Sequence, residues 1–166
     1  CALPIYQGLS RLYPYDIHHL TAQDYINFSQ IMKPFLRPRQ NGIDTLELWI
    51  QGYSNYLRSV GEHHISMHGL YSDCLLKELE SAVKWEIDHN LPVPYLNLKH
   101  ANPDLAAYVW HWFWLAGYAQ YEDTFLVKLV TYGSFRWFSL EELWNSGYKR
   151  KGGVILLDVS KKGREA

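Results

Sequence analysis

Apolar side chains recur at intervals of three and four positions through residues 2–90, a spacing that places them on one face of a helix. The polar segment 37–44 interrupts this pattern and is predicted to be a loop. Four helices are predicted from the periodic segments and their capping and stop residues: residues 2–13, a helix that Thr21 caps and Pro34 ends, a helix from the Asp44–Glu47 capping box to Gly61, and a helix that follows Ser72 and Asp73.

After Asn90 the period changes from helical to the alternation of a strand. The two prolines of the first strand favour an edge position or a strand start, and Gly117 is expected to end the second strand. The predicted elements are strands in "PVPYLNL" (92–98), "VWHWFWLAGY" (109–118) and "TFLVKLVTYG" (124–133), a short helix in "FSLEELWNSGY" (138–148), a final strand in "GGVILLDV" (152–159), and a polar tail over 160–166.

The order of these elements predicts the fold class. Helices followed by strands with short connections are typical of an α+β fold, here a helical layer packed on an antiparallel sheet of about four strands. A chain of 166 residues without a linker or repeat predicts a single domain over 1–166. On the second strand, Trp110, Trp112 and Trp114 are expected to share one face, and His111 and Phe113 the other.

Composition and charge narrow the classes of partner. Aromatic residues make up 16% of the chain, which indicates a core of large flat side chains or a cleft that grips a partner by stacking. The net charge is −1 and the strongest basic run is "YKRKGG", so nucleic acid is not an expected partner. The longest apolar run, around Tyr108 to Ala119, is too short for a membrane span.

Two cysteines, Cys1 and Cys74, do not form a disulfide framework. A chain that begins at cysteine is explained by the edge of a cloned segment, by a cleavage, or by a lipoprotein. The apolar residues that follow Cys1 directly disfavour the lipoprotein. The neighbouring Asp73 carboxylate is expected to raise the pKa of the Cys74 thiol, which favours a small buried side chain over a reactive one.

A pair of histidines, His64 and His68, could share one helical face and bind zinc. The sequence offers no evident third ligand for them. The expectation is therefore a protein without a metal site.

The chain also shows an ordered set of motifs. A cysteine at position 1 is followed by "LPVPYLNL", then by "HWFWLAGY", a strand, a glycine turn and "FSLEELW". This order resembles the papain-like cysteine peptidases, in their compact bacterial C39-like branch. Members of that branch typically carry a cysteine at the start of a helix, a strand with "PV", and "HW" followed by small apolar residues and "GY". The resemblance covers nearly the whole chain and implies a papain-like fold.

The resemblance implies that Cys1 is the nucleophile and His111 the general base. The partial positive charge at a helix N-terminus lowers a thiol pKa, and an imidazole within reach takes the proton and later protonates the leaving group. The family orients its histidine with an Asp or Asn after the next strand. Here that region reads "LVTYGS", so Thr131, a backbone carbonyl or water is expected to hold His111. An uncharged holder implies slow hydrolysis.

The expected function is a cysteine-dependent amide hydrolase, most simply a peptidase, that acts on a peptide or amide through an acyl-enzyme and needs no cofactor. An acyltransferase would use the same acyl-enzyme with an amine in place of water. Two alternatives stay open. The first is a papain-like domain that has lost catalysis and binds a peptide or protein partner in its aromatic cleft. The second is an N-terminal nucleophile hydrolase in which the free amine of Cys1 is the base.

Overall fold

The computed structural model describes residue 19 and residues 21–159. The predicted helix 2–13, the tail 160–166 and Cys1 lie outside the described residues. In chain order the elements are α1 (Ala22–Leu36), α2 (Leu46–Ser59), β1 (Ile65–Tyr71), α3 (Leu76–Asp88), β2 (Val93–Asn97), the 3-10 helix η3 (Pro103–Tyr108), β3 (His111–Tyr121), β4 (Thr124–Thr131), β5 (Ser134–Ser139), α4 (Leu140–Trp144) and β6 (Gly152–Val159).

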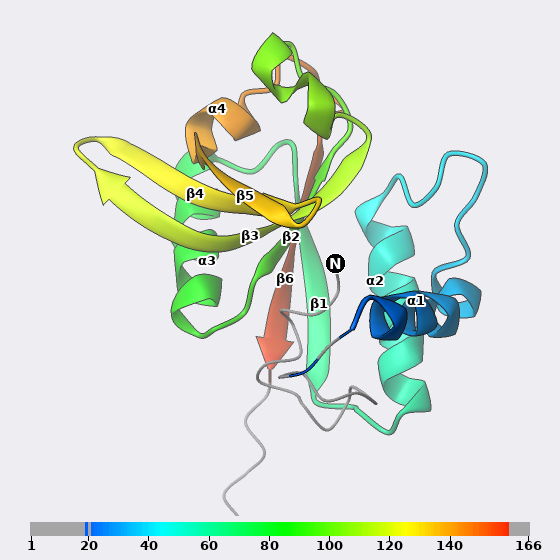
Figure 1. The fold of residues 1–166 in the computed structure, drawn as a ribbon. Helices are drawn as coiled ribbons and strands as arrows, with labels where there is room; N and C mark the ends of the chain where they lie inside the picture. The colour runs from blue at the N-terminus through cyan, green and yellow to red at the C-terminus, as the bar shows by residue number, and fades with distance from the viewer. Residues whose placement is uncertain (1–18, 20, 160–166) are drawn as a thin grey trace, which may run out of the picture.

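The strands form one six-stranded sheet in the order β1-β6-β2-β3-β4-β5, and every neighbouring pair is antiparallel (Figure 1). This arrangement confirms the α+β class and the antiparallel sheet. It contains two strands that the sequence pattern did not predict, β1 and β5. The last strand, β6, lies between β1 and β2, so β1 joins the sheet only through β6.

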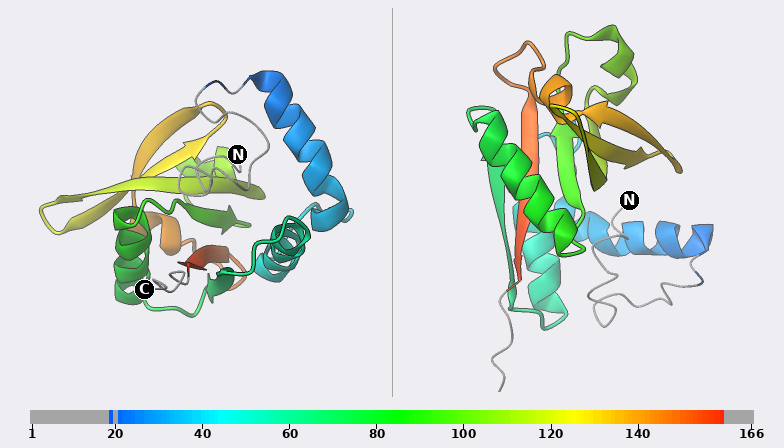
Figure 2. Two further views of the ribbon diagram at one scale, coloured as in Figure 1. Left: turned by 90° about the horizontal axis from the view of Figure 1, so that it is seen from below. Right: turned by 90° about the vertical axis from the view of Figure 1, so that its left-hand side faces the viewer.

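Helices cover both faces of the sheet, which differs from the single helical layer that was predicted. Along β3, Trp112 and Trp114 pack with α1 and α2 into one cluster, the α2-side core. Phe113 and Leu115 pack with α3 and α4 into a second cluster, the α3-side core. Figure 2 shows α2 and α3 on opposite sides of the strands. Because side chains alternate between the two faces of β3, this strand contributes residues to both cores.

The helix ends differ from the prediction in three places. Pro34 lies inside the last turn of α1, which ends at Leu36, where Arg37 adopts a left-handed φ of 44°. The cap of α2 is Thr45, whose hydroxyl accepts a hydrogen bond from the N–H of Leu48. The carboxylate of Asp44 instead binds Arg150 at 2.9 Å. A turn occupies the Ser72–Asp73 region, because the N–H of Cys74 donates to the carbonyl of Tyr71, and α3 begins after it.

The segment that carries His64 and His68 leads into β1 and is not a helix. His68 lies on β1, opposite Leu156 of β6, and its Nδ1 is 3.1 Å from the Asp158 carboxylate. The two histidines therefore do not share the helical face that their spacing predicted. Only pairing with β6, ninety residues downstream in the chain, makes this segment a strand.

Strand β2 is central, not an edge strand. Pro94 is opposite Trp114 of β3, but the pairing of β2 with β6 begins one residue later, at Tyr95. Its missing N–H therefore interrupts no bond in the ladder between β2 and β6. Strand β3 likewise runs through Gly117, where the register with β4 shifts between Leu115 and Tyr118. A β-bulge at this point allows the strand to continue past the glycine.

A carboxylate takes the place of a strand partner where β2 diverges from β6. The N–H of Leu157 donates to Glu86 Oε1 at 3.0 Å, and the Glu86 side chain is only 2% exposed. Its second oxygen, Oε2, accepts no hydrogen bond from the described residues. Burial raises the pKa of Glu86 to about 7.

Candidate functional site

His111 and Thr131 lie at the same end of the sheet although twenty positions separate them. His111 is the first residue of β3, and Thr131 is the last residue of β4, which runs antiparallel to it. The alternation of each strand directs both side chains to the face of the α3-side core, which Phe113 and Leu129 also occupy. The antiparallel register thus brings the predicted base and its predicted holder together.

The imidazole of His111 is held through one of its nitrogens. Its Nε2 lies 2.7 Å from Thr131 Oγ1, and Thr131 is only 4% exposed. The Tyr132 ring stacks on the imidazole with centroids 4.5 Å apart and planes at 9°, and its hydroxyl is 3.4 Å from Nδ1. When Nε2–H donates to Thr131, Nδ1 carries the lone pair that a base needs.

Burial lowers the pKa of His111 below that of an ordinary histidine. The described carboxylates contribute no cause of that shift. A neutral imidazole consequently predominates at neutral pH, which is the form that accepts a proton. The holder is an uncharged hydroxyl, and this fits the lowered pKa, because a carboxylate in its place would stabilise the imidazolium.

Residues with left-handed backbone flank both members of the pair. Trp110 precedes His111 with φ 53°, and Tyr132 follows Thr131 with φ 51°. Tyr132 and Gly133 form the two-residue turn between β4 and β5, where positive φ at both positions matches the twist of a hairpin. Trp110 lies in the turn between η3 and β3. A left-handed φ in such a bulky residue is strained, and strain of this kind clusters at functional sites.

Trp110 does not share a face with Trp112 and Trp114, in contrast to the prediction. Strand β3 begins one residue later, and Trp110 is 52% exposed, with the Arg150 guanidinium 5.9 Å from its ring. Tyr132 is 70% exposed. Trp110 adjoins His111 in sequence, and Tyr132 stacks on its half-buried imidazole, so two exposed aromatic side chains here offer flat surfaces for stacking.

Asn97 is a residue that the sequence reasoning missed. It is directly opposite His111 in the pairing of β2 with β3, and it is 1% exposed. Both polar atoms of its side chain, Oδ1 and Nδ2, lack a hydrogen-bond partner among the described residues. A buried amide without a partner is costly and marks a position that calls for an explanation. Its signal in the sequence is a single Asn within the buried run "PVPYLNL".

The second cysteine has the properties of an unreactive thiol. Cys74 Sγ lies 3.5 Å from the Leu75 carbonyl and 3.6 Å from Glu78 Oε2. Burial first, and then the hydrogen bond to Glu78, raise the pKa of the Cys74 thiol, with a smaller contribution from Asp73. The predicted direction is confirmed, and Glu78 is the stronger of the two acidic neighbours. The predicted nucleophile, Cys1, lies outside the described residues.

Two further observations concern metals and membranes. Among the described residues, no three His, Cys, Asp or Glu side chains are grouped so that they could hold a metal ion. None of the helices in this part of the chain has the length and apolar character needed to cross a membrane.

Comparison with known proteins gave no match for this chain, whether among family models, curated proteins or solved structures.

Proposed function

We propose that the protein is a cysteine-dependent amide hydrolase in which His111 is the general base, Thr131 orients it and Cys1 is the nucleophile. The observation that carries this proposal is the 2.7 Å contact between His111 Nε2 and Thr131 Oγ1. It occupies Nε2 of the imidazole, and when Nε2–H is the donor, Nδ1 is left to accept a proton. The resemblance to papain-like peptidases suggests Cys1 as the source of that proton.

The proposed reaction is acyl transfer to sulfur. His111 Nδ1 takes the proton of the Cys1 thiol, and the thiolate attacks the carbonyl carbon of a peptide or amide. The imidazolium then gives the proton to the leaving nitrogen, the C–N bond breaks, and an acyl-enzyme forms. Water attacks this thioester in a hydrolase, and an amine attacks it in a transferase. Each acceptor loses its proton to His111, and Cys1 regains a proton when the product leaves.

Because Thr131, the residue that orients His111, is uncharged, we expect slow hydrolysis. A hydroxyl stabilises the imidazolium less than the carboxylate of a catalytic triad does, so the pair should be slower than one with an aspartate. The lowered pKa of His111 keeps it unprotonated over a wider pH range, which favours its role as the base at neutral pH.

A second candidate function is the binding of a partner without catalysis. The exposed Trp110 and Tyr132 beside the imidazole favour it, because large flat side chains are the usual anchors of a binding surface. Under this alternative Cys1 would be an ordinary thiol.

Alkylation of the two cysteines separates these functions. The protein is treated briefly with iodoacetamide at pH 6, and the labelling of Cys1 and Cys74 is compared by peptide mapping. An activated Cys1 should label more than about tenfold faster than Cys74, since pairing with a base raises the thiolate fraction. The same comparison in denaturant is the control and should show similar rates. Equal, slow labelling of both cysteines in the folded protein would contradict the hydrolase and favour the binding domain.

A further inference from the structure

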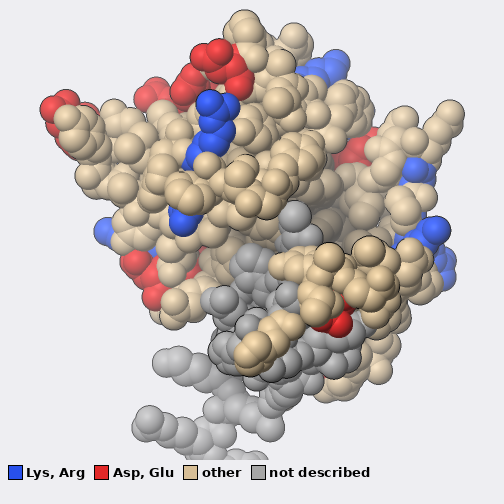
Figure 3. Space-filling model, in the orientation of Figure 1, with Lys and Arg blue, Asp and Glu red and all other residues tan. Residues whose placement is uncertain are grey.

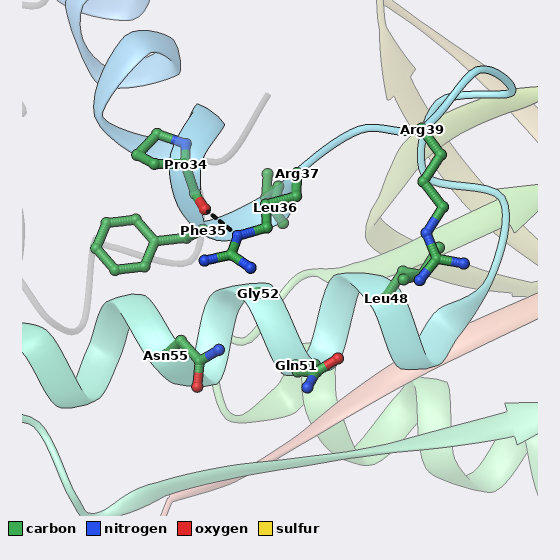
Figure 4. A pocket seen from close by; sticks show the side chains of 9 residues that line it. All are labelled: Pro34, Phe35, Leu36, Arg37, Arg39, Leu48, Gln51, Gly52 and Asn55. Atoms are coloured by element: carbon green, nitrogen blue, oxygen red, sulfur yellow. Dashed lines mark hydrogen bonds between the residues drawn. The ribbon is translucent and has the colours of Figure 1, made fainter.

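A second region of the molecule has the shape of a ligand site. A cavity of about 640 Å³ lies between the end of α1, the connection to α2, and α2 itself (Figure 4). Its volume is in the range of pockets that hold small molecules. His111, Thr131 and Tyr132 do not line it, so it is separate from the candidate catalytic site. Its walls are formed by Pro34, Phe35, Leu36, Arg37, Arg39, Leu48, Gln51, Gly52 and Asn55.

The cavity carries positive charge without a compensating carboxylate. Arg37 and Arg39 line it, and no acidic residue stands among the described residues of its wall. Arg37 Nε donates to the Pro34 carbonyl at 3.0 Å, which fixes the guanidinium while its terminal nitrogens stay available. Figure 3 shows Lys and Arg side chains gathered on the right-hand side of the molecule, where the connection from α1 to α2 lies in Figure 1.

Both arginines stand on a well-defined backbone. The N–H of Arg37 closes the end of α1 on the Lys33 carbonyl at 3.0 Å. Arg39 and Gly42 exchange two backbone hydrogen bonds, of 3.0 and 2.8 Å. Gly42 has φ +75°, a conformation that favours glycine. A short loop closed by two backbone hydrogen bonds holds the backbone of Arg39 in one position, from which its exposed side chain can reach a ligand.

The floor of the cavity is one face of α2. Gln51 and Asn55 are four positions apart and present their amides from successive turns. Arg58 donates to Asn55 Oδ1 at 3.3 Å, which leaves the Nδ2 donor of that amide available. Between them, Gly52 allows the end of α1 to approach, because a Cβ there would lie 2.9 Å from the Leu36 Cα and from the Phe35 carbonyl oxygen.

We propose that this cavity binds a phosphate monoester of a small molecule, with the exposed side chains of Arg37 and Arg39, which Figure 4 draws at separate places along the wall, turning toward the phosphate. Two guanidinium groups with no acidic neighbour in the wall match a dianion better than a singly charged carboxylate. Gln51 and Asn55 add uncharged donors. The apolar part of the ligand would pack on Phe35, Leu36 and Leu48, since the cavity is larger than a phosphate alone requires.

Isothermal titration of the full chain with phenyl phosphate tests the proposal. The parent protein should bind it, and Arg39→Gln should weaken the affinity about tenfold or more, since a hydrogen bond to a charged group contributes about 1.5–3 kcal/mol. Arg39 is the better substitution, because its side chain makes no hydrogen bond to the described residues that the fold would lose. Arg136→Gln, an exposed position on β5, is the matched control and should bind like the parent.

Two further ligands make the test specific. Inorganic phosphate should bind more weakly than phenyl phosphate if the apolar wall contributes, and benzoate should bind more weakly if two charges are needed. Benzoate that binds as tightly as phenyl phosphate would overturn the assignment to a phosphate. Absence of binding by phenyl phosphate, or equal binding by the parent and Arg39→Gln, would overturn the site itself. A circular dichroism spectrum of each variant establishes that it is folded.

Discussion

The two ends of the central strands bury polar groups in different ways. At the Val93 end, Glu86 accepts the N–H of Leu157 and replaces a strand partner that is missing. At the Asn97 end, Thr131 holds one nitrogen of His111, while the other nitrogen has only the long contact to Tyr132. The first group completes the backbone ladder. The second is positioned and, in the tautomer whose Nε2–H donates to Thr131, keeps a lone pair on Nδ1. That difference separates a structural polar group from a candidate catalytic one.

The strongest test of this difference between the two ends is to remove the imidazole of His111. His111→Ala should lower the rate of Cys1 alkylation at pH 6 on the order of a hundredfold, because an unpaired thiol is almost fully protonated at that pH. Peptide mapping after brief exposure to iodoacetamide measures the rate. His89→Ala is the matched control, since the side chain of that exposed histidine, at the end of α3, contacts the carbonyl and ring of Trp85. A His111→Ala protein that labels as fast as the parent would show that the two residues are not a pair.

At the Val93 end of the central strands, the expected effect is on the free energy of unfolding. The folded pKa of Glu86, about 7, exceeds the value of about 4.3 for an unfolded glutamate. The folded state therefore binds the extra proton between these values, and the free energy of unfolding falls as the pH rises from about 4.3 to about 7 and then levels off. Glu86→Gln removes this dependence, so its stability relative to the parent should increase by about 2–3 kcal/mol between pH 5 and pH 8.

Urea unfolding of both proteins at pH 5 and pH 8 measures this difference. Since all other titrating groups are common to the two chains, their contributions cancel when the values are subtracted. Parallel stability curves for parent and variant would mean that Glu86 does not titrate in this range, and the contrast between the two ends would be lost.

The smallest expected effect sharpens the role of the holder. Thr131→Val keeps the shape of the side chain and removes one hydrogen bond, which contributes about 0.5–1.5 kcal/mol. Cys1 alkylation should slow by about two- to tenfold, with no change in the labelling of Cys74. Tyr132→Phe, which keeps the stacked ring, should have less effect, because its hydroxyl is 3.4 Å from Nδ1. If Tyr132→Phe slowed the alkylation of Cys1 more than Thr131→Val did, Tyr132 and not Thr131 would be the residue that orients His111.

Much of the second half of the fold could be predicted because its signals are local. The alternation along 124–133 predicts a strand there, and in β4 Phe125, Val127 and Leu129 share one face, which the structure shows to be buried. Ser139 caps α4 through the N–H of Glu142, as the residue types indicate. Each of these features depends on residues a few positions apart, where periodicity and capping chemistry are informative.

What could not be predicted depends on distant partners. Strand β1 exists because it pairs with β6, although His64 and His68, just before and within it, also fit a helical spacing. Asp44 could have capped α2, but Arg150, from the far end of the chain, binds its carboxylate. The central position of β2 results from its pairing with both β3 and β6, which no local pattern near Pro94 encodes. Tertiary contacts overrode the local preference in each case.

In the candidate site, too, some residues could be predicted from the sequence and others could not. The position of Thr131 after the strand that follows "HWFWLAGY" singled it out from sequence, and the fold places it in contact with His111. Asn97 was missed because its significance lies in burial and in the lack of a partner. The exposure of Trp110 was missed because a strand pattern does not reveal that the backbone turns left-handed one residue before β3.

The central place of β6 also governs how the chain can fold during synthesis. Ile155 and Leu157 belong to the α2-side core, while Val154 and Leu156 belong to the α3-side core. Neither cluster is complete, and β1 has no strand partner, until residues 152–159 have left the ribosome. Contacts of such long sequence separation form slowly, and they leave apolar surface and an open strand edge exposed in the meantime. A nascent chain of this protein should therefore keep apolar surface exposed until β6 inserts between β1 and β2.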